Sequence, residues 1–250
     1  MRGLSGKRVI VTGGASGIGA ATCLRLAQEG CTVAVFDRDG PGAHRVADAC
    51  GAHAEGFAVD ITDEDQVEAA VAAFDAAGDI EGLANVAGWD KGGLFLDTDR
   101  ALWDRIIQIN LYGPLNLHKA VLSRMQRRGR GRVVNVSSDA GRVGSSGEGV
   151  YSACKGGIIA FTKTMAREMA RSGVTLNVLC PGPTDTPLFQ GFTQDMPGGD
   201  KLKDGLTRAI PLRRLGQPDD YPGMIAFLLS DDAAFMTGQT ISISGGLTMS

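Results

Sequence analysis

Residues 12–19 are Thr12-Gly13-Gly14-Ala15-Ser16-Gly17-Ile18-Gly19, and this glycine-rich stretch decides the fold of the 250-residue chain. It follows a short β-branched run, residues 8–12 (RVIVT), and opens a segment of helical period, residues 17–29. A glycine-rich turn from a strand into a helix brings backbone N–H groups and the positive end of the helix dipole to a phosphate, because no Cβ blocks the approach. The sequence therefore predicts a strand–turn–helix unit that binds a pyrophosphate.

The same alternation of strand and helix continues along the chain. The further predicted strands are residues 32–36, 54–59, 80–85, 132–137, 174–179 and 240–243, and the further predicted helices are residues 41–50, 63–77, 99–128, 150–171 and 219–230. Successive strand-then-helix units imply parallel strands with right-handed crossovers. No repeat or low-complexity linker divides the chain. We therefore expect one α/β domain over residues 1–250, a doubly wound Rossmann-type parallel sheet of about seven strands with helices on both faces.

The alternation breaks at residues 181–216, which hold five of the nine prolines and several glycines. A stretch this long without clear elements is typical of an active-site lid or of disorder. We expect a substrate lid at about residues 187–212. Residues 201–214 carry five basic side chains against one aspartate, which suits either an exposed lid face or contact with the phosphates of a coenzyme A handle.

Composition excludes several classes of protein. The net charge is -3, and no basic stripe offsets it, which argues against nucleic acid as a partner. The five cysteines are odd in number, widely spread and without a C-x-x-C pair, so we expect free thiols and no metal site. No signal-peptide layout or apolar run of about 18 residues is present, so we expect a cytoplasmic protein that does not bind a membrane.

An acidic residue, Asp37, ends the second predicted strand, about 20 residues beyond the glycine turn. A carboxylate there can accept hydrogen bonds from the adenosine ribose hydroxyls and repel a 2′-phosphate. The alternative role for Asp37 is to begin a plain turn with Asp39 and Gly40. In the context of the glycine turn, Asp37 favours NAD over NADP.

A second group of residues carries chemistry: Ser138, Tyr151 and Lys155. Tyr151 and Lys155 are four apart in a predicted helix and share a face, so the ammonium is expected to lower the pKa of the phenol. A tyrosinate is a general base for an alcohol, and the phenol is a general acid for a ketone. Ser138 lies at the carboxyl end of a predicted strand, where its hydroxyl can orient the substrate oxygen. A Tyr-x-x-x-Lys pair alone is most often a solvated helix face; combined with the glycine turn it predicts an enzyme.

The T-G-x-x-x-G-x-G spacing of residues 12–19, together with Ser138, Tyr151 and Lys155, resembles the short-chain dehydrogenase/reductase family. The resemblance covers essentially the whole sequence. It implies an NAD-dependent oxidoreductase that transfers a hydride between NAD and a secondary alcohol or ketone without a metal. It also implies that Asn110 completes the catalytic set by holding a water in the proton relay from the lysine.

Further segments match the family. Asp60-Ile61 resembles the family's contact to the adenine, and Pro181-Gly182-Pro183-Thr184-Asp185-Thr186 resembles its contact to the nicotinamide. Asn85-Val86-Ala87-Gly88 resembles the family's N-N-A-G, with Val86 in place of the second asparagine. The residues expected to bind NAD are Thr12, Gly13, Ser16, Gly17, Ile18, Gly19, Asp37, Asp60, Ile61, Asn85, Ala87, Gly88, Tyr151, Lys155, Pro181, Gly182, Thr184 and Thr186.

A narrower resemblance points to a branch of the family that acts on cyclic 2-hydroxyacyl thioesters of coenzyme A. It is carried by residues 88–90, 145–148, 153–157, 180–186 and 244–249. One alternative is a 3-oxoacyl carrier-protein reductase, although such enzymes usually use NADPH and Ala15-Ser16 stands where a basic residue is then expected. Another alternative is a non-enzymatic dinucleotide sensor. The family resemblance and the apolar side chains on several faces of predicted helices 99–128 and 150–171 favour a homotetramer.

Overall fold

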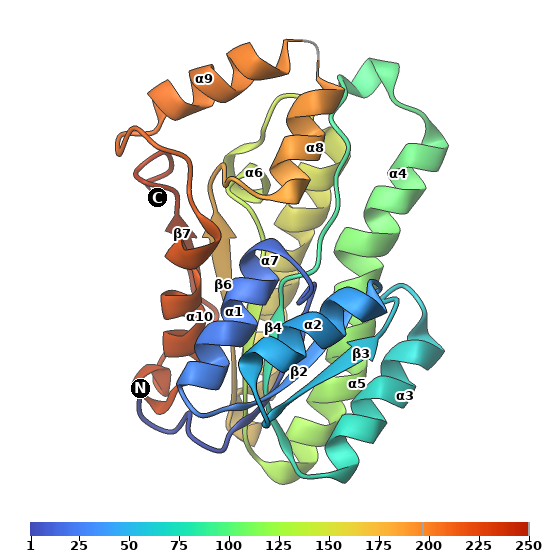
Figure 1. Cartoon of the computed structure of the whole chain (residues 1–250), viewed down its shortest axis with the longest axis vertical. Helices are drawn as coiled ribbons and strands as arrows, with labels where there is room; N and C mark the ends of the chain where they lie inside the picture. The colour runs from blue at the N-terminus through green and yellow to red at the C-terminus, as the bar shows by residue number, and fades with distance from the viewer. Residues whose placement is uncertain (197, 250) are drawn as a thin grey trace.

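The computed structural model describes residues 1–196 and 198–249, and within them seven parallel strands form one sheet in the order β3-β2-β1-β4-β5-β6-β7 (Figure 1). The strands are β1 (Arg8–Thr12), β2 (Thr32–Asp37), β3 (Ala54–Ala58), β4 (Ile80–Asn85), β5 (Gly131–Val136), β6 (Val174–Pro181) and β7 (Thr240–Ile243). The predicted doubly wound sheet is confirmed, and every predicted strand lies within two residues of its observed bounds.

Helices cover both faces of the sheet. One face packs against α1 (Gly17–Gln28), α2 (Gly40–Cys50) and α10 (Pro222–Leu229). The other face packs against α3 (Glu64–Ala76), α5 (Gly113–Arg128) and α7 (Gly149–Met169). The remaining α-helices are α4 (Arg100–Ile107), α6 (Ala140–Val143), α8 (Pro187–Asp195) and α9 (Gly199–Ala209), and short 3-10 turns cover Phe95–Asp97, Ala170–Ser172, Pro218–Asp220 and Asp231–Ala233.

The central strands are buried on both sides, which explains their unbroken apolar runs. In β1, Val9 and Val11 face the cluster that holds α1 and α10, whereas Ile10 between them faces the cluster that holds α3 and α5. All three side chains are fully buried. Neighbouring residues of a strand point to opposite faces, so a strand between two helical layers needs apolar side chains at every position.

The order of connection reverses between β1 and β4, whose last residues, Thr12 and Asn85, are paired in register. The segments that follow these two strands leave the sheet side by side. Gly13 has φ +67°, and a Cβ on it would lie 2.8 Å from the Cα of Ala87. A crevice outside the carboxyl ends of the strands at such a reversal is where open α/β sheets bind ligands.

The predicted helix over residues 99–128 is interrupted. The structure has α4, then a π-helical turn over Gln108–Tyr112 in which the N–H of Gly113 donates to the Gln108 carbonyl, then α5. Pro114 has no N–H to donate to the carbonyl of Asn110 four residues earlier, so regular α-helical bonding cannot pass this point. Hydrophobic periodicity missed the interruption because the apolar positions continue through it.

The segment that we expected to lack clear elements holds two helices, α8 and α9. Thr186 caps α8 by accepting a hydrogen bond from the N–H of Phe189, and Pro187 is the first helical residue. That is a standard helix start. The high density of proline and glycine in this part of the sequence concealed it. The predicted helix over 219–230 is likewise a 3-10 turn followed by α10.

Candidate active site

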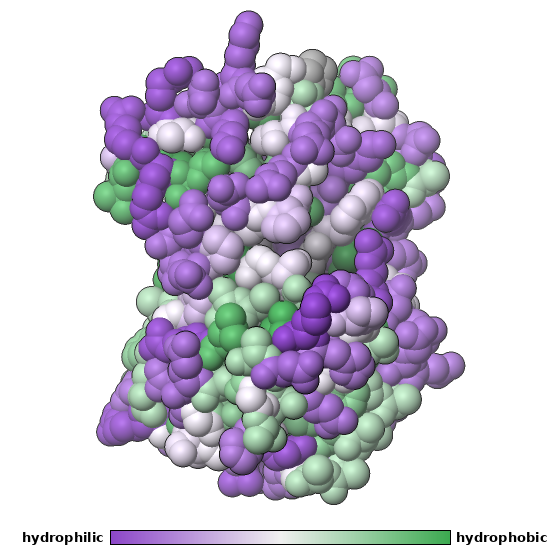
Figure 2. Space-filling model, in the orientation of Figure 1, coloured by the Kyte–Doolittle hydropathy of each residue, from purple (hydrophilic) through white to green (hydrophobic). Residues whose placement is uncertain are grey.

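A cleft of about 970 Å³ runs along the carboxyl ends of the strands, below α8. Its floor comes from the glycine turn and the ends of β2, β4, β5 and β6, and its walls come from α7, α8 and the segment that holds Leu247 and Thr248. Figure 2 shows the molecule narrowed at its middle, where pale and apolar surface lies between more hydrophilic upper and lower parts.

Most of the residues predicted to form the site line this one cleft. They are Gly13, Ser16, Gly17, Ile18, Gly19, Asp37, Asp60, Ile61, Ala87, Gly88, Ser138, Tyr151, Lys155, Pro181, Gly182, Thr184 and Thr186. Thr12, Asn85 and Asn110 are buried behind its wall instead, with 5 % or less of each exposed. The structure thus brings together segments that are far apart in the sequence.

The glycine turn leaves the N-terminus of α1 open to the cleft. Ser16 is the N-cap residue, but its side chain makes no capping hydrogen bond, and the first turn contains no acidic residue. The first N–H groups of a helix have no partner within the helix. Gly17, with φ +52°, and Gly19, where a Cβ would lie 2.0 Å from the Gly13 carbonyl oxygen, exclude side chains from this corner. The cradle fits the pyrophosphate of a dinucleotide.

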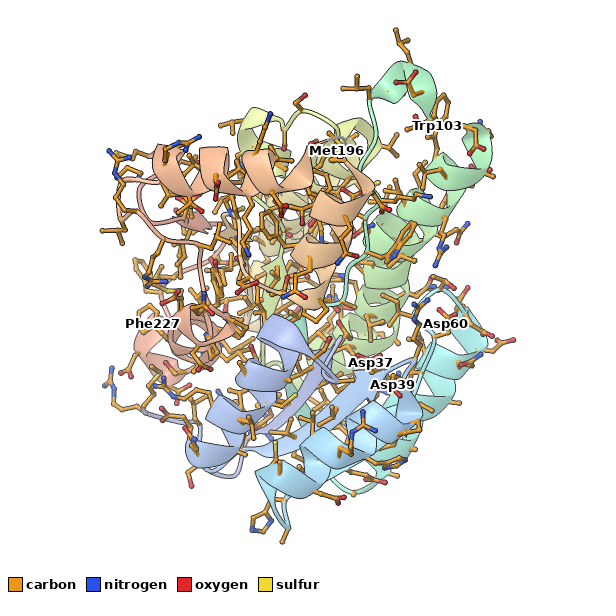
Figure 3. All side chains as sticks on the ribbon, turned by 45° about the horizontal axis from the view of Figure 1, so that its top comes forward. Asp37, Asp39, Asp60, Trp103, Met196 and Phe227 are labelled. Carbon is orange, nitrogen blue, oxygen red and sulfur yellow. The ribbon has the colours of Figure 1, made fainter. Side chains whose placement is uncertain are left out.

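Asp37 ends β2 at the rim of the cleft. One carboxylate oxygen accepts the N–H of Ala15 at 3.0 Å, and the other accepts the N–H of Asp39 at 2.9 Å. The carboxylate thus organises the turn at Asp39 and also lines the cleft, so its part in the turn leaves it available to a ligand. Each oxygen keeps a lone pair for a ligand hydroxyl. Figure 3 shows Asp37, Asp39 and Asp60 on the same side of the cleft.

Thr12 and Asn85 shape the wall from behind. The Thr12 hydroxyl accepts the N–H groups of Val86 and Ala87 at 3.1 and 3.2 Å. Asn85 donates to the side-chain oxygen of Asn135 at 3.0 Å, which ties β4 to β5. Thr12 and Asn85, which were predicted to bind the cofactor, thus hold the backbone behind the cleft and do not line it.

Asn110 is completely buried and its amide is fully engaged. The amide nitrogen donates to the carbonyls of Trp89 and Ile106 at 2.6 and 2.9 Å, and the amide oxygen accepts the N–H of Trp89 at 3.2 Å. This side chain anchors the loop after β4 to the π-helical turn. A water in a relay would have to use its backbone carbonyl, for which Pro114 has no donor.

Ser138, Tyr151 and Lys155 meet at the cleft end of β5. The Lys155 ammonium donates to the carbonyl of Val136 at 3.2 Å and lies 5.4 Å from the centre of the Tyr151 ring. The Ser138 hydroxyl acts to lower the pKa of the Tyr151 phenol, and it accepts the N–H of Ala140 at 3.1 Å. The Ser137 hydroxyl donates to the backbone carbonyl of Lys155 at 2.8 Å and fixes α7 against β5.

The pKa shifts in this group differ from the sequence expectation. Burial raises the pKa of the Tyr151 phenol above its ordinary value, and the carboxyl groups of Glu148 and Asp90 raise it further. Burial also lowers the pKa of the Lys155 ammonium to about 8. The expected lowering of the phenol pKa by Lys155 is therefore outweighed in the chain by desolvation and by two neighbouring acids.

Those two acids, Asp90 and Glu148, were not among the predicted site residues. Both line the cleft, Asp90 from the loop after β4 and Glu148 from the N-cap of α7. Both stand in segments that carry the narrower resemblance, residues 88–90 and 145–148, but neither was assigned to the catalytic or cofactor-binding set. The burial of these two carboxyl groups next to Tyr151 depends on the tertiary structure, which places their two segments together.

The upper wall of the cleft rests on a short segment after β6. Thr184 is 4 % exposed, and its hydroxyl donates to the Gly182 carbonyl and is hydrogen-bonded to Tyr221. Met196, just beyond α8, packs against Gly92 and Gly147, where added Cβ atoms would lie 2.7 and 2.8 Å from its side chain. Figure 3 shows Met196 above Asp37.

Two other features, a membrane-spanning helix and a cluster of metal ligands, are not found among the described residues. No helix among the described residues combines the length and apolar character needed to cross a membrane. Over residues 1–196 and 198–249, no three histidine, cysteine, aspartate or glutamate side chains are grouped as metal ligands.

Comparison with known proteins gives matches over nearly the whole chain. Residues 13–248 match the family described as enoyl-(acyl carrier protein) reductase. The chain is 35 % identical over 247 residues to the 3-oxoacyl-(acyl-carrier-protein) reductase FabG of Vibrio cholerae, covering 98 % of this chain and 99 % of that protein. It is 34 % identical over 245 residues to the reductase of the same name from Escherichia coli, covering 98 % of each.

A solved structure is similar in the same way. The crystal structure of 3-ketoacyl-(acyl-carrier-protein) reductase from Brucella melitensis complexed with NADH superposes with a TM-score of 0.91 at 30 % identity, covering 98 % of this chain and 100 % of that one. The similarity thus extends over the sheet, the cleft and the segment above it.

Proposed function

Since this chain belongs to the short-chain dehydrogenase/reductase family, we propose that it reduces the ketone of a 3-oxoacyl thioester with NADH and oxidises the corresponding alcohol with NAD. The observation that carries the proposal is the common cleft, which is lined both by the open N-terminus of α1 and by Ser138, Tyr151 and Lys155. A dinucleotide held at the first group brings its nicotinamide toward the second. The bound cofactor supplies or accepts the hydride.

In this proposal Tyr151 carries the proton. Its phenol donates a proton to the ketone oxygen during reduction, which leaves a tyrosinate, and the tyrosinate accepts the alcohol proton during oxidation. The Ser138 hydroxyl, which lines the same cleft, holds the same substrate oxygen. The Lys155 ammonium, fixed by the Val136 carbonyl, stabilises the tyrosinate and binds the nicotinamide ribose. The Asn110 backbone carbonyl supports a water that returns the proton to Lys155.

We propose NAD rather than NADP as the cofactor because of Asp37. Its carboxylate is held at the rim by two backbone N–H groups, so a 2′-phosphate would meet a fixed negative charge. Arg38, the next residue, also lines the cleft and is the cation that could offset this charge. Ala15 and Ser16 add no positive charge at the glycine turn.

For the acyl group, the names of the curated relatives favour a 3-oxoacyl chain on acyl carrier protein. A second candidate is 2-hydroxycyclohexanecarboxyl-CoA, favoured by the short segments that resemble the dehydrogenase acting on it, Gly88-Trp89-Asp90 among them. In both compounds the alcohol carbon lies β to the thioester carbonyl. The proposed reaction is therefore the same, and only the acyl group and its handle differ.

The test is steady-state kinetics with acetoacetyl carrier protein, acetoacetyl-CoA and 2-oxocyclohexanecarboxyl-CoA, each with NADH and NADPH. We expect turnover of at least one thioester, with NADH preferred. Tight NADH binding without turnover of any of the three would contradict the proposal and favour a non-enzymatic dinucleotide sensor.

We also propose a cytoplasmic homotetramer with a substrate lid at about residues 187–212. The five free cysteines, four of them buried, suit a reducing compartment. Exposed apolar side chains such as Leu96 and Phe235 suit burial between subunits. Light scattering at micromolar concentration tests the assembly, and a monomer would contradict it.

A further inference from the structure

The loop after β4 places a buried acid in the wall of the cleft. Asp90 is 6 % exposed, and neither of its carboxylate oxygens has a hydrogen-bond donor of normal geometry among the described residues. Burying an ionised carboxylate without hydrogen-bond donors costs free energy, so such a group either remains protonated or contacts a ligand. Asp90 lines both the cleft and a small pocket behind it that is walled by Phe95, Trp103 and Glu148.

Glu148 is the partner of Asp90. Both residues line the cleft and the small pocket behind it, and each carboxyl shifts the pKa of the other. Two carboxylates are both acceptors, so they can bond only when one of them holds a proton. Two carboxyls that share a site hold one proton between them over a wide pH range, and the pair then carries a net charge of -1.

One cation faces this charge, the Lys155 ammonium, whose hydrogen bond goes to the Val136 carbonyl. The other groups that face the pair are Ser145, the backbone N–H of Lys91, the Tyr151 phenol and the Cys154 thiol. No salt bridge to Asp90 or Glu148 is formed among residues 1–196 and 198–249. The nearby Arg105 guanidinium stacks on the Trp89 ring, 3.9 Å from its centre.

The upper wall shields the pair from bulk water. Met196 packs against Gly92, two residues after Asp90, and against Gly147, the residue before Glu148. Interactions between charges are stronger where water is excluded. The negative charge therefore acts on whatever occupies the reacting end of the cleft, next to Tyr151.

We propose that the Asp90–Glu148 pair selects the substrate by charge, admitting the neutral thioester of a 3-hydroxy or 3-oxo acid and rejecting the free carboxylate of the same acid. This inference rests on the proposed function. The carboxyl carbon of such an acid is two bonds from the reacting carbon, so its charge would lie near the pair whenever the ketone meets Tyr151. At about 6 Å and an effective dielectric constant of about 20, two unit negative charges repel enough to weaken binding roughly a hundredfold.

The test compares the oxidation of 3-hydroxybutyrate with that of its methyl ester, using NAD and racemic compounds. Wild-type protein is expected to prefer the ester by about a hundredfold in kcat/KM. Asp90→Asn and Glu148→Gln each remove the shared proton but leave one ionised carboxylate, so each should keep most of this preference. The double variant Asp90→Asn/Glu148→Gln removes the charge and should reduce the preference to less than tenfold, chiefly through faster oxidation of the acid.

The control is Asp195→Asn/Asp200→Asn, which removes the same number of carboxylates from outside the cleft wall and should keep the wild-type preference. Binding of NADH, followed by fluorescence, shows whether each variant is folded. A preference below tenfold in the wild-type protein, or an unchanged preference in the double variant, would overturn the inference. Turnover of 3-hydroxybutyryl-CoA by the wild-type protein is measured alongside, because its absence would instead overturn the proposed function.

A second readout separates charge from shape. The pair raises the pKa of Tyr151, so removing its charge should move the pH profile of alcohol oxidation to lower pH. The double variant should show this shift, and the two single variants should show less of it. A profile that stays in place in the double variant would mean that the pair does not act on the reacting end of the cleft by charge.

Discussion

The Lys155 ammonium donates a hydrogen bond to the backbone carbonyl of Val136 across 3.2 Å, so the last residue of β5 holds the cation of α7 in place. The same ammonium lies 5.4 Å from the centre of the Tyr151 ring. It is 3 % exposed, and burial lowers its pKa to about 8. A strand end and a helix thus position the two side chains on which the proposed proton transfer depends.

Replacing Tyr151 by Phe should lower kcat for ketone reduction by at least about a hundredfold, because it removes the proton donor while the buried ring keeps its packing. Binding of NADH should change little. Steady-state kinetics and fluorescence titration check the two parts. Near-full activity in a folded variant would mean that another group carries the proton.

Replacing Lys155 by Ala should be as harmful to kcat and should also weaken NADH binding, because the ammonium is assigned to both the phenol and the ribose. In the wild-type protein, Lys155 loses its proton as pH rises through about 8. Binding of NADH should therefore weaken above that pH in the wild-type protein and stay flat in the variant. Parallel pH dependences in both proteins would argue against a role for Lys155 at the ribose.

Replacing Asp37 by Asn should reduce the preference for NADH over NADPH by at least about tenfold, which is about 1.4 kcal/mol of transition-state stabilisation. The reason is that the amide removes the charge that faces a 2′-phosphate. The measurement is kcat/KM with each cofactor. Asp39→Asn, at the same turn, is the matched control and should leave the preference unchanged. An equal change of the cofactor preference in both variants would show that Asp37 does not select the cofactor by its charge.

Replacing Gly13 by Ala should abolish NADH binding and destabilise the protein by roughly 2 kcal/mol or more. The glycine has φ +67°, and the new Cβ would press on the Ala87 backbone. Urea unfolding measures the loss. Gly191→Ala, in α8 with no atom within 4 Å of the new Cβ, serves as the control and should be neutral or slightly stabilising.

Replacing Asp90 by Asn should stabilise the protein more at pH 8 than at pH 4. Burial and Glu148 raise the pKa of Asp90 from an ordinary value of 3.8 to about 7. Between these values the folded chain holds a proton that the unfolded chain has lost, so the stability contributed by this group falls as pH rises from about 4 to about 7.

The Asp90→Asn variant has no carboxyl at this position and so does not lose this stability. We expect its free energy of unfolding, relative to the wild-type protein, to be roughly 1 to 3 kcal/mol higher at pH 8 than at pH 4. Urea unfolding at the two pH values measures it, and Asp195→Asn should show no such difference. An equal effect of Asp90→Asn at both pH values would show that this carboxyl ionises normally.

Local patterns predicted most of the fold. Short apolar runs placed β1 and β4 at their observed bounds, because a strand buried on both faces must be apolar at consecutive positions. A short β-branched run placed the half-buried edge strand β7. The glycine turn predicted where the cleft lies, because only glycine tolerates the backbone geometry and the close approach to Ala87. The sequence also predicted that Ser138, Tyr151 and Lys155 face one cleft, because Ser138 follows a strand end and the other two share one face of a helix.

What depends on contacts between distant segments was not visible in the sequence. The interruption at Gln108–Tyr112 and the burial of the Asn110 amide against Trp89 arise where a helix meets the loop after β4. The helices α8 and α9 were concealed by a composition typical of loops.

The sequence by itself determined the sheet, the glycine turn and the residue types of the candidate site, because these follow from local backbone geometry and the periodicity of apolar residues. Only the tertiary structure decided the electrostatics. Asp90 and Glu148 belong to different loops, and their pKa values and that of Tyr151 depend on burial and on distances across the cleft. Desolvation is a property of the folded environment of a group, so no sequence pattern around Tyr151 could reveal that its pKa is raised.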